Sequence, residues 1–115
     1  MTIVAGVDFG TQSVRVSLVD HAAGVVGIGV AEYPVQRDPG DPDHATQSHA
    51  AHMEGLVAAT LAALREAGVA GDAVRALAVD TTGSTVVVVG DGLEPLGEYY
   101  LWCDHRAKAE AARIT

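Results

Sequence analysis

The chain has 115 residues, of which 49% are hydrophobic, and a formal net charge of −8 at pH 7. This length and a mean hydropathy of +0.22 indicate a folded protein of one domain or part of one. The negative charge repels nucleic acid, and no segment reaches the ~18 consecutive apolar residues of a membrane span, so neither is an expected partner. Cys103 is the only cysteine, which excludes an internal disulfide. Since no basic region precedes the first apolar stretch, the expected location is cytoplasmic.

The first third of the chain predicts a three-stranded meander. Its apolar runs are rich in small and β-branched residues, and Val14, Val16 and Leu18 alternate with polar residues, which puts them on one face of a strand. In the third run, Gly27 and Gly29 indicate a bulge or the close approach of another backbone. The runs are residues 2–7, 14–19 and 25–33, and the turns are residues 10–13 and 21–24.

The middle of the chain predicts a loop followed by one long helix. Prolines and a glycine between residues 34 and 44 are typical of a loop. The helix is expected from His49 to Ala67, with Ser48 as its N-cap and Gly68 as its C-terminal cap. The three-and-four spacing predicts a buried face made of Met53, Leu56, Val57, Thr60, Leu61 and Leu64.

The last third predicts short strands, a turn and the start of a second helix. The valine run 86–89 is expected to be a buried strand. The expected elements are strands at 74–79, 85–89 and 99–102, a tight turn at Asp91 and Gly92, and a helix at 106–114.

The first turn carries small polar residues between Asp8, which ends one apolar run, and Arg15 in the next. Gly10 lets the backbone approach a ligand, and the hydroxyl, amide and N–H groups of residues 11–13 are suited to holding phosphate oxygens. Asp8 would tolerate phosphates only if a cation such as Mg²⁺, or its bound water, lay between them. The alternative is an ordinary hairpin tip with a solvated aspartate.

A second motif, D-T-T-G-S-T from Asp80 to Thr85, again places an acid at the end of an apolar run, before a glycine and hydroxyl residues. If this strand pairs in parallel with the first strand, Asp8 and Asp80 emerge at the same sheet edge, where ligands bind in open α/β sheets. The alternative is a turn capped by its own side chains.

The third motif, L-W-C-D-H-R-A at residues 101–107, combines an indole with charged side chains. Trp102 is suited to stacking on the C–H face of a sugar ring while Asp104 and its neighbours bind the sugar hydroxyls. The alternative places Trp102 in the core and makes Asp104 the cap of the last helix. Cys103 is expected to be a buried or half-buried thiol and not a nucleophile.

Three histidines, His44, His49 and His52, raise the question of a metal site, because residues three apart share a helix face. No cysteine completes a ligand set near them, so we expect surface histidines.

Together, D-F-G-T-Q-S-V-R, D-T-T-G-S-T and L-W-C-D-H-R-A resemble, in order and spacing, the N-terminal part of the FGGY carbohydrate kinases, most closely the ribulokinase-like branch. The resemblance covers residues 1–115, as an incomplete part of the first kinase domain. It implies an α/β fold of the ribonuclease H-like class found in actin and hexokinase-type ATPases, with a mixed sheet in which an antiparallel meander precedes a helix and further strands. It also implies ATP-dependent phosphoryl transfer to a hydroxyl of a ketopentose such as ribulose, or of a related sugar or polyol.

The resemblance further implies roles for individual residues. Asp8 would hold Mg²⁺ through water, and Arg15 would meet the transferring phosphate, so these two are the expected catalytic residues. The expected ATP phosphate site is Gly10, Thr11, Gln12 and Ser13, and the expected sugar contacts are Gly83, Ser84, Trp102, Asp104 and His105.

Members of this family are several times longer than this chain. Their catalytic base, second phosphate motif and adenine pocket are expected beyond residue 115, so these residues alone are expected to be inactive. One alternative is a non-catalytic ribonuclease H-like half-domain that binds a ligand or acts as an assembly module. Another, an Hsp70-like ATPase, shares the first motif but leaves L-W-C-D-H-R-A unexplained. The expected partners are ATP and a small sugar or polyol. The sequence does not decide between a monomer and a homodimer.

Overall fold

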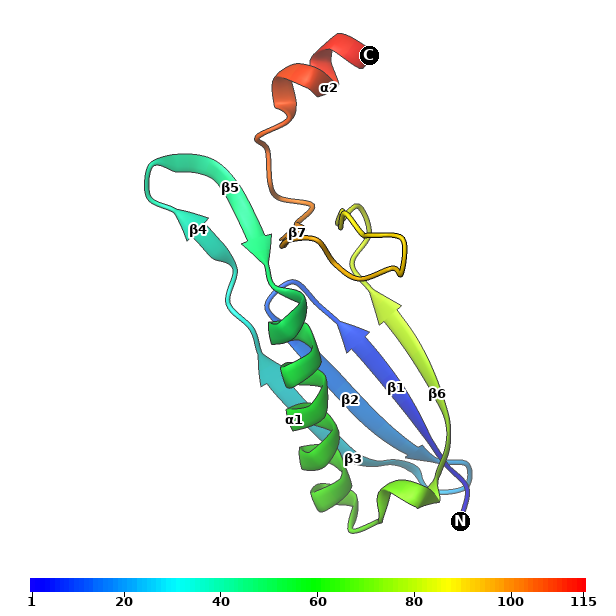
Figure 1. Cartoon of the computed structure of the whole chain (residues 1–115). Coiled ribbons are helices and arrows are strands. Elements are labelled where there is room, and N and C mark those ends of the chain that lie inside the picture. Colours follow the sequence, from blue (N-terminus) through cyan, green and yellow to red (C-terminus); the bar gives the residue numbers. More distant parts are fainter.

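The computed structural model describes residues 1–115, which form two sheets and two α-helices in an elongated body of 54 × 29 × 26 Å. The larger sheet has the strand order β3-β2-β1-β6, in which β1, β2 and β3 are antiparallel and β6 runs parallel to β1 (Figure 1). The predicted meander and the predicted α/β class with a mixed sheet are therefore confirmed. The strands of this sheet are β1 (Ile3–Phe9), β2 (Ser13–Asp20), β3 (Gly24–Glu32) and β6 (Val74–Thr81).

One long helix, α1 (His49–Ala67), covers one face of the larger sheet, over β2 and β3 (Figure 1). It begins and ends at the predicted residues. The Ser48 side chain accepts a hydrogen bond from the Ala51 amide at 3.0 Å, and Gly68 ends the helix in the left-handed conformation at φ 67°. The core beneath the helix is made of Ile3, Ala5, Val7, Val14, Val16, Leu18 and Tyr33, with Ala59 and Ala63 from α1.

The predicted buried face of α1 is wrong, and two glycines of β3 explain why. A Cβ atom on Gly29 would lie 1.8 Å from the Ala59 carbonyl oxygen, and one on Gly27 would lie 2.4 Å from that of Ala63. The helix and the strand approach so closely that only small residues fit between them, so the larger apolar residues turn outward. The buried helix residues are Gly55, Ala59 and Ala63, the half-buried ones are Leu56, Thr60 and Leu64, and Met53, Val57 and Leu61 are 42%, 58% and 50% exposed.

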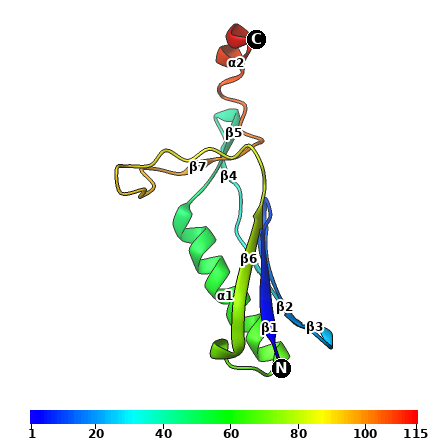
Figure 2. The same ribbon diagram turned by 90° about the vertical axis from the view of Figure 1, so that its right-hand side faces the viewer.

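Seen from the β6 edge, α1 lies on one side of the sheet (Figure 2). It packs on β3 and β2, so the edge strand β6 extends the sheet beyond the area that α1 covers. Leu77 and Val79 pair in register with the core residues Ala5 and Val7 and therefore lie on the same face of the sheet. Even so, Leu77 and Val79 are 57% and 60% exposed. The outward side of α1 and this face of β6 both present apolar side chains.

A smaller sheet of three strands follows the order β4-β5-β7. Its hairpin occupies much of the stretch for which a loop was predicted, so that prediction is wrong. Pairing is possible because the hairpin turns at Pro39 and Gly40, where the Asp38 side chain accepts a hydrogen bond from the Gly40 amide at 2.8 Å. Pro42 lies inside β5, in the irregular stretch between the paired positions Asp41 and Thr46. The strands are β4 (Gln36–Asp38), β5 (Asp41–Gln47) and β7 (Tyr99–Tyr100).

The predicted buried strand at the valine run is also wrong. Val86 to Val89 are 39–56% exposed and form only isolated bridges, Val86 with Tyr100 and Val89 with Pro95. The turn at Asp91 and Gly92 is present as predicted. The remaining elements are the 3-10 helix η1 (Gly71–Ala73) and the short helix α2 (Lys108–Ile114), and neither α1 nor α2 is long and apolar enough to span a membrane.

Candidate functional site

The turn between β1 and β2 is held from behind by Tyr33, the residue that follows β3. The Tyr33 hydroxyl lies 2.7 Å from the Gly10 carbonyl oxygen and 2.9 Å from that of Ser13, so its proton is shared between two acceptors. The Tyr33 amide donates to the Gln12 carbonyl at 3.0 Å. Burial, with the Asp8 carboxylate nearby, raises the pKa of Tyr33 to about 12, so the hydroxyl keeps its proton. One side chain and one amide thus bind three of the four turn carbonyls.

The fourth carbonyl of this turn, that of Thr11, is bound by Gln47 at the end of β5. The buried Gln47 side chain donates through Nε2 to the Thr11 oxygen at 2.6 Å and to the Tyr33 oxygen at 3.2 Å. Its Oε1 lies 2.8 Å from His52 Nε2 on α1. The His52 ring stacks on Tyr33 with centroids 4.3 Å apart and an interplanar angle of 8°. Burial, followed by the neighbouring His49, lowers the pKa of His52, which favours the neutral ring.

The N–H groups of Thr11 and Gln12 have no hydrogen-bond acceptor within the chain, whereas all four carbonyls of residues 10–13 have donors. Unpaired backbone donors at a turn form an anion-binding concavity, because several positive dipole ends converge on one ligand. The geometry of this turn is therefore suited to an anion.

Asp8 and Asp80 lie side by side at the same sheet edge, as their motifs predicted. They are register partners in the parallel β1–β6 ladder, and Asp8 is also the register partner of Arg15 across the antiparallel β1–β2 ladder. The three charged side chains line one hollow of about 390 Å³ on the face of the sheet away from α1. The two salt bridges of the chain join Arg106 to Asp104 and Lys108 to Asp43, so the exposed Arg15 guanidinium forms none.

Trp102 links the third motif to the first. Its indole N–H donates to the Thr11 hydroxyl at 3.0 Å, and the side chain is 53% exposed, so the alternative that placed it in the core is wrong. Trp102, Ser84 and Asp104 line a cleft of about 550 Å³ together with Val86, Tyr100, Leu101, Arg106, Ala107 and Glu110.

Asp104 does not cap the last helix, so that alternative is wrong as well. The N-cap of α2 is Ala107, which has no side-chain cap bond. The Asp104 carboxylate instead accepts from the Ala45 amide at 2.9 Å, from the Arg106 amide at 3.1 Å and from the Arg106 guanidinium at 2.9–3.2 Å. The hydrogen bond from Arg106 and the amide donors outweigh burial and hold the pKa of Asp104 well below its usual range. Asp104 thus ties β5 to the turn that carries Trp102.

Two other residues predicted to contact sugar, Gly83 and His105, do not line this cleft. Gly83 is exposed, and a Cβ atom there would meet nothing within 4 Å. His105 is exposed, and its amide donates to the Asp43 carbonyl at 2.8 Å. Ser84, which does line the cleft, has the left-handed φ of 64°, a strained conformation for a residue with a side chain and one that concentrates at binding sites.

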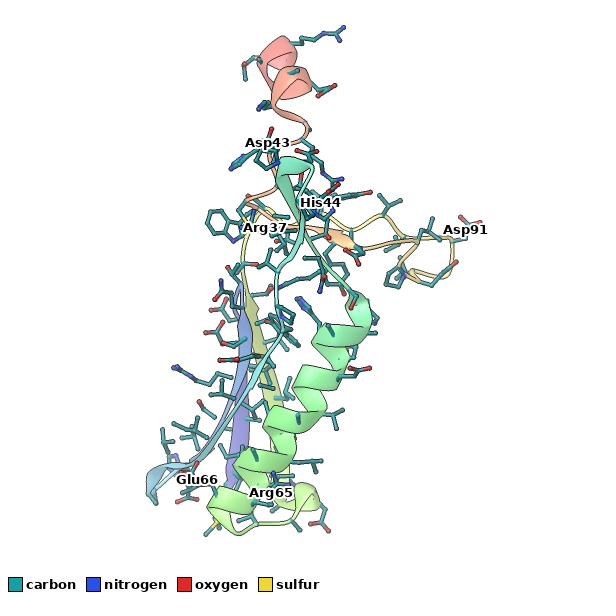
Figure 3. The ribbon with its side chains drawn as sticks, turned by 90° about the vertical axis from the view of Figure 1, so that its left-hand side faces the viewer. Arg37, Asp43, His44, Arg65, Glu66 and Asp91 are labelled. Carbon is teal, nitrogen blue, oxygen red and sulfur yellow. The ribbon has the colours of Figure 1, made fainter.

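The three histidines considered as metal ligands instead form hydrogen bonds or stacking contacts within the chain. His44 bonds through Nδ1 to the Gln36 carbonyl across the β4–β5 hairpin, where Arg37 lies beside it (Figure 3). His49 bonds to the Tyr99 hydroxyl, and His52 is stacked on Tyr33. No group of three histidine, cysteine, aspartate or glutamate side chains is placed to hold a metal ion. Cys103 is half-buried, as predicted.

Tyr33, Gln47 and His52 form the support of the turn, and no sequence motif pointed to them. Gln47 reaches a residue 36 positions earlier in the chain. The one available signal was a polar residue directly before the N-cap Ser48, between the predicted loop at residues 34–44 and the predicted helix.

Comparison with known proteins identifies the family. Residues 3–115 match the model of the N-terminal domain of the FGGY family of carbohydrate kinases. A D-ribulokinase of Saccharomyces cerevisiae is 29% identical over 119 residues, covering 95% of this chain and 16% of the yeast protein. This relative agrees with the predicted ribulokinase-like branch.

Solved structures agree on the fold. A xylulose kinase from Brucella ovis superimposes with a TM-score of 0.88 at 25% identity, covering 97% of this chain and 23% of its own. A xylulose kinase from Rhodospirillum rubrum gives a TM-score of 0.82 at 23% identity, over 97% and 22% of the two chains. The predicted ribonuclease H-like class is thereby confirmed, and the chain spans less than a quarter of the length of these proteins. This chain belongs to the FGGY family of carbohydrate kinases, and residues 3–115 match its N-terminal domain.

Proposed function

We propose that residues 1–115 are the N-terminal part of an ATP-dependent sugar kinase, called here the complete kinase, that phosphorylates a ketopentose such as ribulose. The observation that carries the proposal is the turn at residues 10–13, whose carbonyls are all bound inside the protein while the amides of Thr11 and Gln12 have no acceptor. This turn lies next to the charged strand ends and is bonded to the cleft that Trp102 lines.

The turn is proposed to bind the β- and γ-phosphates of ATP, through Gly10, Thr11, Gln12 and Ser13. The amides of Thr11 and Gln12 would donate to phosphate oxygens, and Gly10 would let the backbone come close. Arg15, which forms no salt bridge, would meet the transferring phosphate and neutralise its charge. Asp8 has an exposed carboxylate at the strand end, which fits a contact to Mg²⁺ through water. When bound, Mg²⁺ would neutralise phosphate charge beside Asp8.

The cleft of about 550 Å³ is proposed to hold the sugar. Trp102 would stack on the ring or carbon chain of the substrate, and Asp104, a carboxylate at neutral pH, would accept hydrogen bonds from hydroxyls. Ser84 would add a hydroxyl contact. Gly83 and His105 are also proposed to contact the sugar because of their positions in the motifs, although neither lines the cleft in this structure.

In the proposed reaction, a sugar hydroxyl oxygen forms a bond to the γ-phosphorus while the bond between that phosphorus and the β–γ bridging oxygen breaks. The products are a sugar phosphate and ADP, and the hydroxyl proton passes to a base that we place outside residues 1–115. Such a transfer depends on positioning and charge neutralisation more than on covalent chemistry, and this chain offers residues for both tasks.

Two relatives support the choice of substrates. The similar yeast protein is a D-ribulokinase, and a structurally similar glycerol kinase from Plasmodium falciparum was solved with ADP, at 17% identity and a TM-score of 0.82 over all of this chain and 23% of its own. Because ATP is the proposed phosphate donor, the proposed location is the cytoplasm.

The test is an ATP-consumption assay of the complete kinase against a panel of ketopentoses and polyols, with residues 1–115 alone measured beside it. We expect ADP release that depends on one ketopentose and on Mg²⁺ from the complete kinase, and none from residues 1–115 alone. If none of the ketopentoses and polyols supports ATP consumption, the kinase proposal is overturned and a non-catalytic half-domain is favoured.

A further inference from the structure

We propose that Tyr33 and Gln47, with His52 behind Gln47, are positioning residues that set the backbone of the turn at residues 10–13 so that its amides are available to phosphate. The inference rests on the proposed function for the identity of the ligand, and on the hydrogen bonds of the turn for the arrangement itself. None of the three residues needs to touch ATP for this role.

Tyr33 and Gln47 bind all four carbonyls of the turn. A peptide unit directs its C=O and N–H in nearly opposite directions, so binding a carbonyl on the protein side turns the N–H of the next residue away from the protein. Gln47 binds the Thr11 carbonyl, which belongs to the same peptide unit as the Gln12 amide. The Tyr33 hydroxyl binds the Gly10 carbonyl, which shares its peptide unit with the Thr11 amide. These two amides are the ones without an acceptor.

The side-chain amide of Gln47 has one defined orientation. The carbonyls of Thr11 and Tyr33 can only accept, so Gln47 Nε2 must face them, and its Oε1 then faces His52 Nε2 at 2.8 Å. The ring of His52 is fixed in turn by stacking on Tyr33 and by an edge contact with Tyr99, at centroid distances of 4.3 and 5.0 Å. A neutral His52 with its proton on Nε2 satisfies this arrangement.

The two residues that bind the turn are buried, whereas the turn itself is not. Tyr33 and Gln47 are each 1% exposed, and both lie outside the turn that they bind. A buried network in which every polar atom has a partner holds one geometry, and no buried side-chain nitrogen or oxygen atom of this chain lacks a partner. The turn is therefore fixed before any ligand arrives, which is what rapid phosphoryl transfer requires of its donors.

The test uses Tyr33→Phe, which removes only the shared hydroxyl, and Gln47→Glu, which replaces the amide donor by a carboxylate of the same shape. The matched control is Tyr99→Phe, because this hydroxyl binds His49 and does not touch the turn. In the complete kinase, each test variant should raise the KM for ATP or lower kcat by ~10- to 100-fold, with the sugar KM within twofold of wild type. The Tyr99→Phe variant should stay within twofold in all three constants.

A second readout does not depend on kinase activity. In amide NMR spectra, the Thr11 and Gln12 resonances should move in Tyr33→Phe and Gln47→Glu and stay in place in Tyr99→Phe. If the wild-type kinase is inactive with every sugar, the proposed function fails and these shifts still decide the positioning role. If the kinase is active but both test variants match wild type in ATP kinetics, or if the two amide resonances do not move, the positioning role is overturned. Should Gln47→Glu fail to fold, Tyr33→Phe alone decides.

Discussion

The indole nitrogen of Trp102 lies 3.0 Å from the hydroxyl oxygen of Thr11, a residue 91 positions earlier in the chain, and donates a hydrogen bond to it. This bond joins the turn proposed to bind ATP phosphates to the cleft proposed to bind the sugar. Phosphoryl transfer requires the attacking hydroxyl and the γ-phosphate to be aligned. A direct hydrogen bond between the turn and the cleft limits the movement of one proposed binding site relative to the other.

A double-mutant cycle on this pair tests the link. Trp102→Phe and Thr11→Val each remove one partner of the hydrogen bond, and each should lower kcat/KM of the complete kinase for ATP by ~2- to 10-fold, the value of one hydrogen bond. Because the bond is already lost in either single variant, the double variant should show much less than the sum of the two effects in free energy. Additive effects in steady-state kinetics would contradict the link.

Asp8→Ala should abolish turnover of the complete kinase and leave sugar binding largely intact. The reason is that Asp8 lies at the sheet edge, in the hollow with Arg15 and Asp80, and does not line the cleft of Trp102. Turnover and sugar affinity are measured separately, by ATP consumption and by calorimetry. Near-normal turnover in the variant would rule out its proposed role at the metal and phosphates.

Asp104 should show both a binding role and a structural role. Asp104→Ala removes the acceptor for the Ala45 amide and the partner of Arg106, so we expect a lowered melting temperature. We also expect a rise in sugar KM of ~10- to 1,000-fold with little change in the KM for ATP, because a lost bond from a charged group costs ~1.5–3 kcal/mol and misplacement adds to it.

The matched variant Asp104→Asn separates the two roles, because the amide oxygen still accepts from Ala45 while the charge is lost. Because its NH₂ group replaces the oxygen that accepts from the Arg106 amide and the ion pair is lost, it should melt between Asp104→Ala and wild type and still raise the sugar KM. A lowered melting temperature with an unchanged sugar KM in both variants would remove Asp104 from the proposed site.

Gly29→Ala should destabilise the chain strongly. The added Cβ atom would lie 1.8 Å from the Ala59 carbonyl oxygen, which is backbone and cannot turn aside, so the cost should reach or exceed the upper end of the ~1–3 kcal/mol typical of overpacking. Gly6→Ala is the control, because a Cβ atom there meets nothing within 4 Å. Urea unfolding of both variants measures the difference, and equal stability would show that α1 and β3 are not as close as described.

Protonation of His52 should destabilise the fold at mildly acidic pH. Burial lowers its pKa in the folded state, so the unfolded chain binds this proton more tightly. The free energy of unfolding should therefore be highest above the unfolded histidine pKa of about 6.5 and fall as pH drops below that value, until the folded pKa is passed. Unfolding measured across this range should show a smaller pH dependence for His52→Phe than for wild type. An equal dependence in the two proteins would assign it to other groups.

The features that could be predicted from sequence are those with local causes. The caps of α1 at Ser48 and Gly68 depend on neighbouring residues, and both were found at the predicted positions. The placement of Asp8 beside Asp80 followed from two strand-end motifs and one assumption, parallel pairing, which proved correct.

The features that could not be predicted depend on contacts between distant segments. The close approach of another backbone that Gly27 and Gly29 indicated is confirmed, but the sequence did not show that its partner is α1 at Ala59 and Ala63, and periodicity alone favoured the larger side chains. The role of Gln47 depends on a hairpin bringing it to Thr11, in a stretch whose prolines indicated a loop. Both errors concern tertiary packing, which overrides local pattern.

The most direct test of the central claim is a structure of the complete kinase with a non-hydrolysable ATP analogue and a ketopentose. The quantity to measure is the distance from the amide nitrogens of Thr11 and Gln12 to the nearest phosphate oxygens. We predict hydrogen-bond distances of about 2.7–3.2 Å for at least one of these amides, with the sugar against the Trp102 ring. A bound analogue whose phosphates contact neither amide would contradict the account.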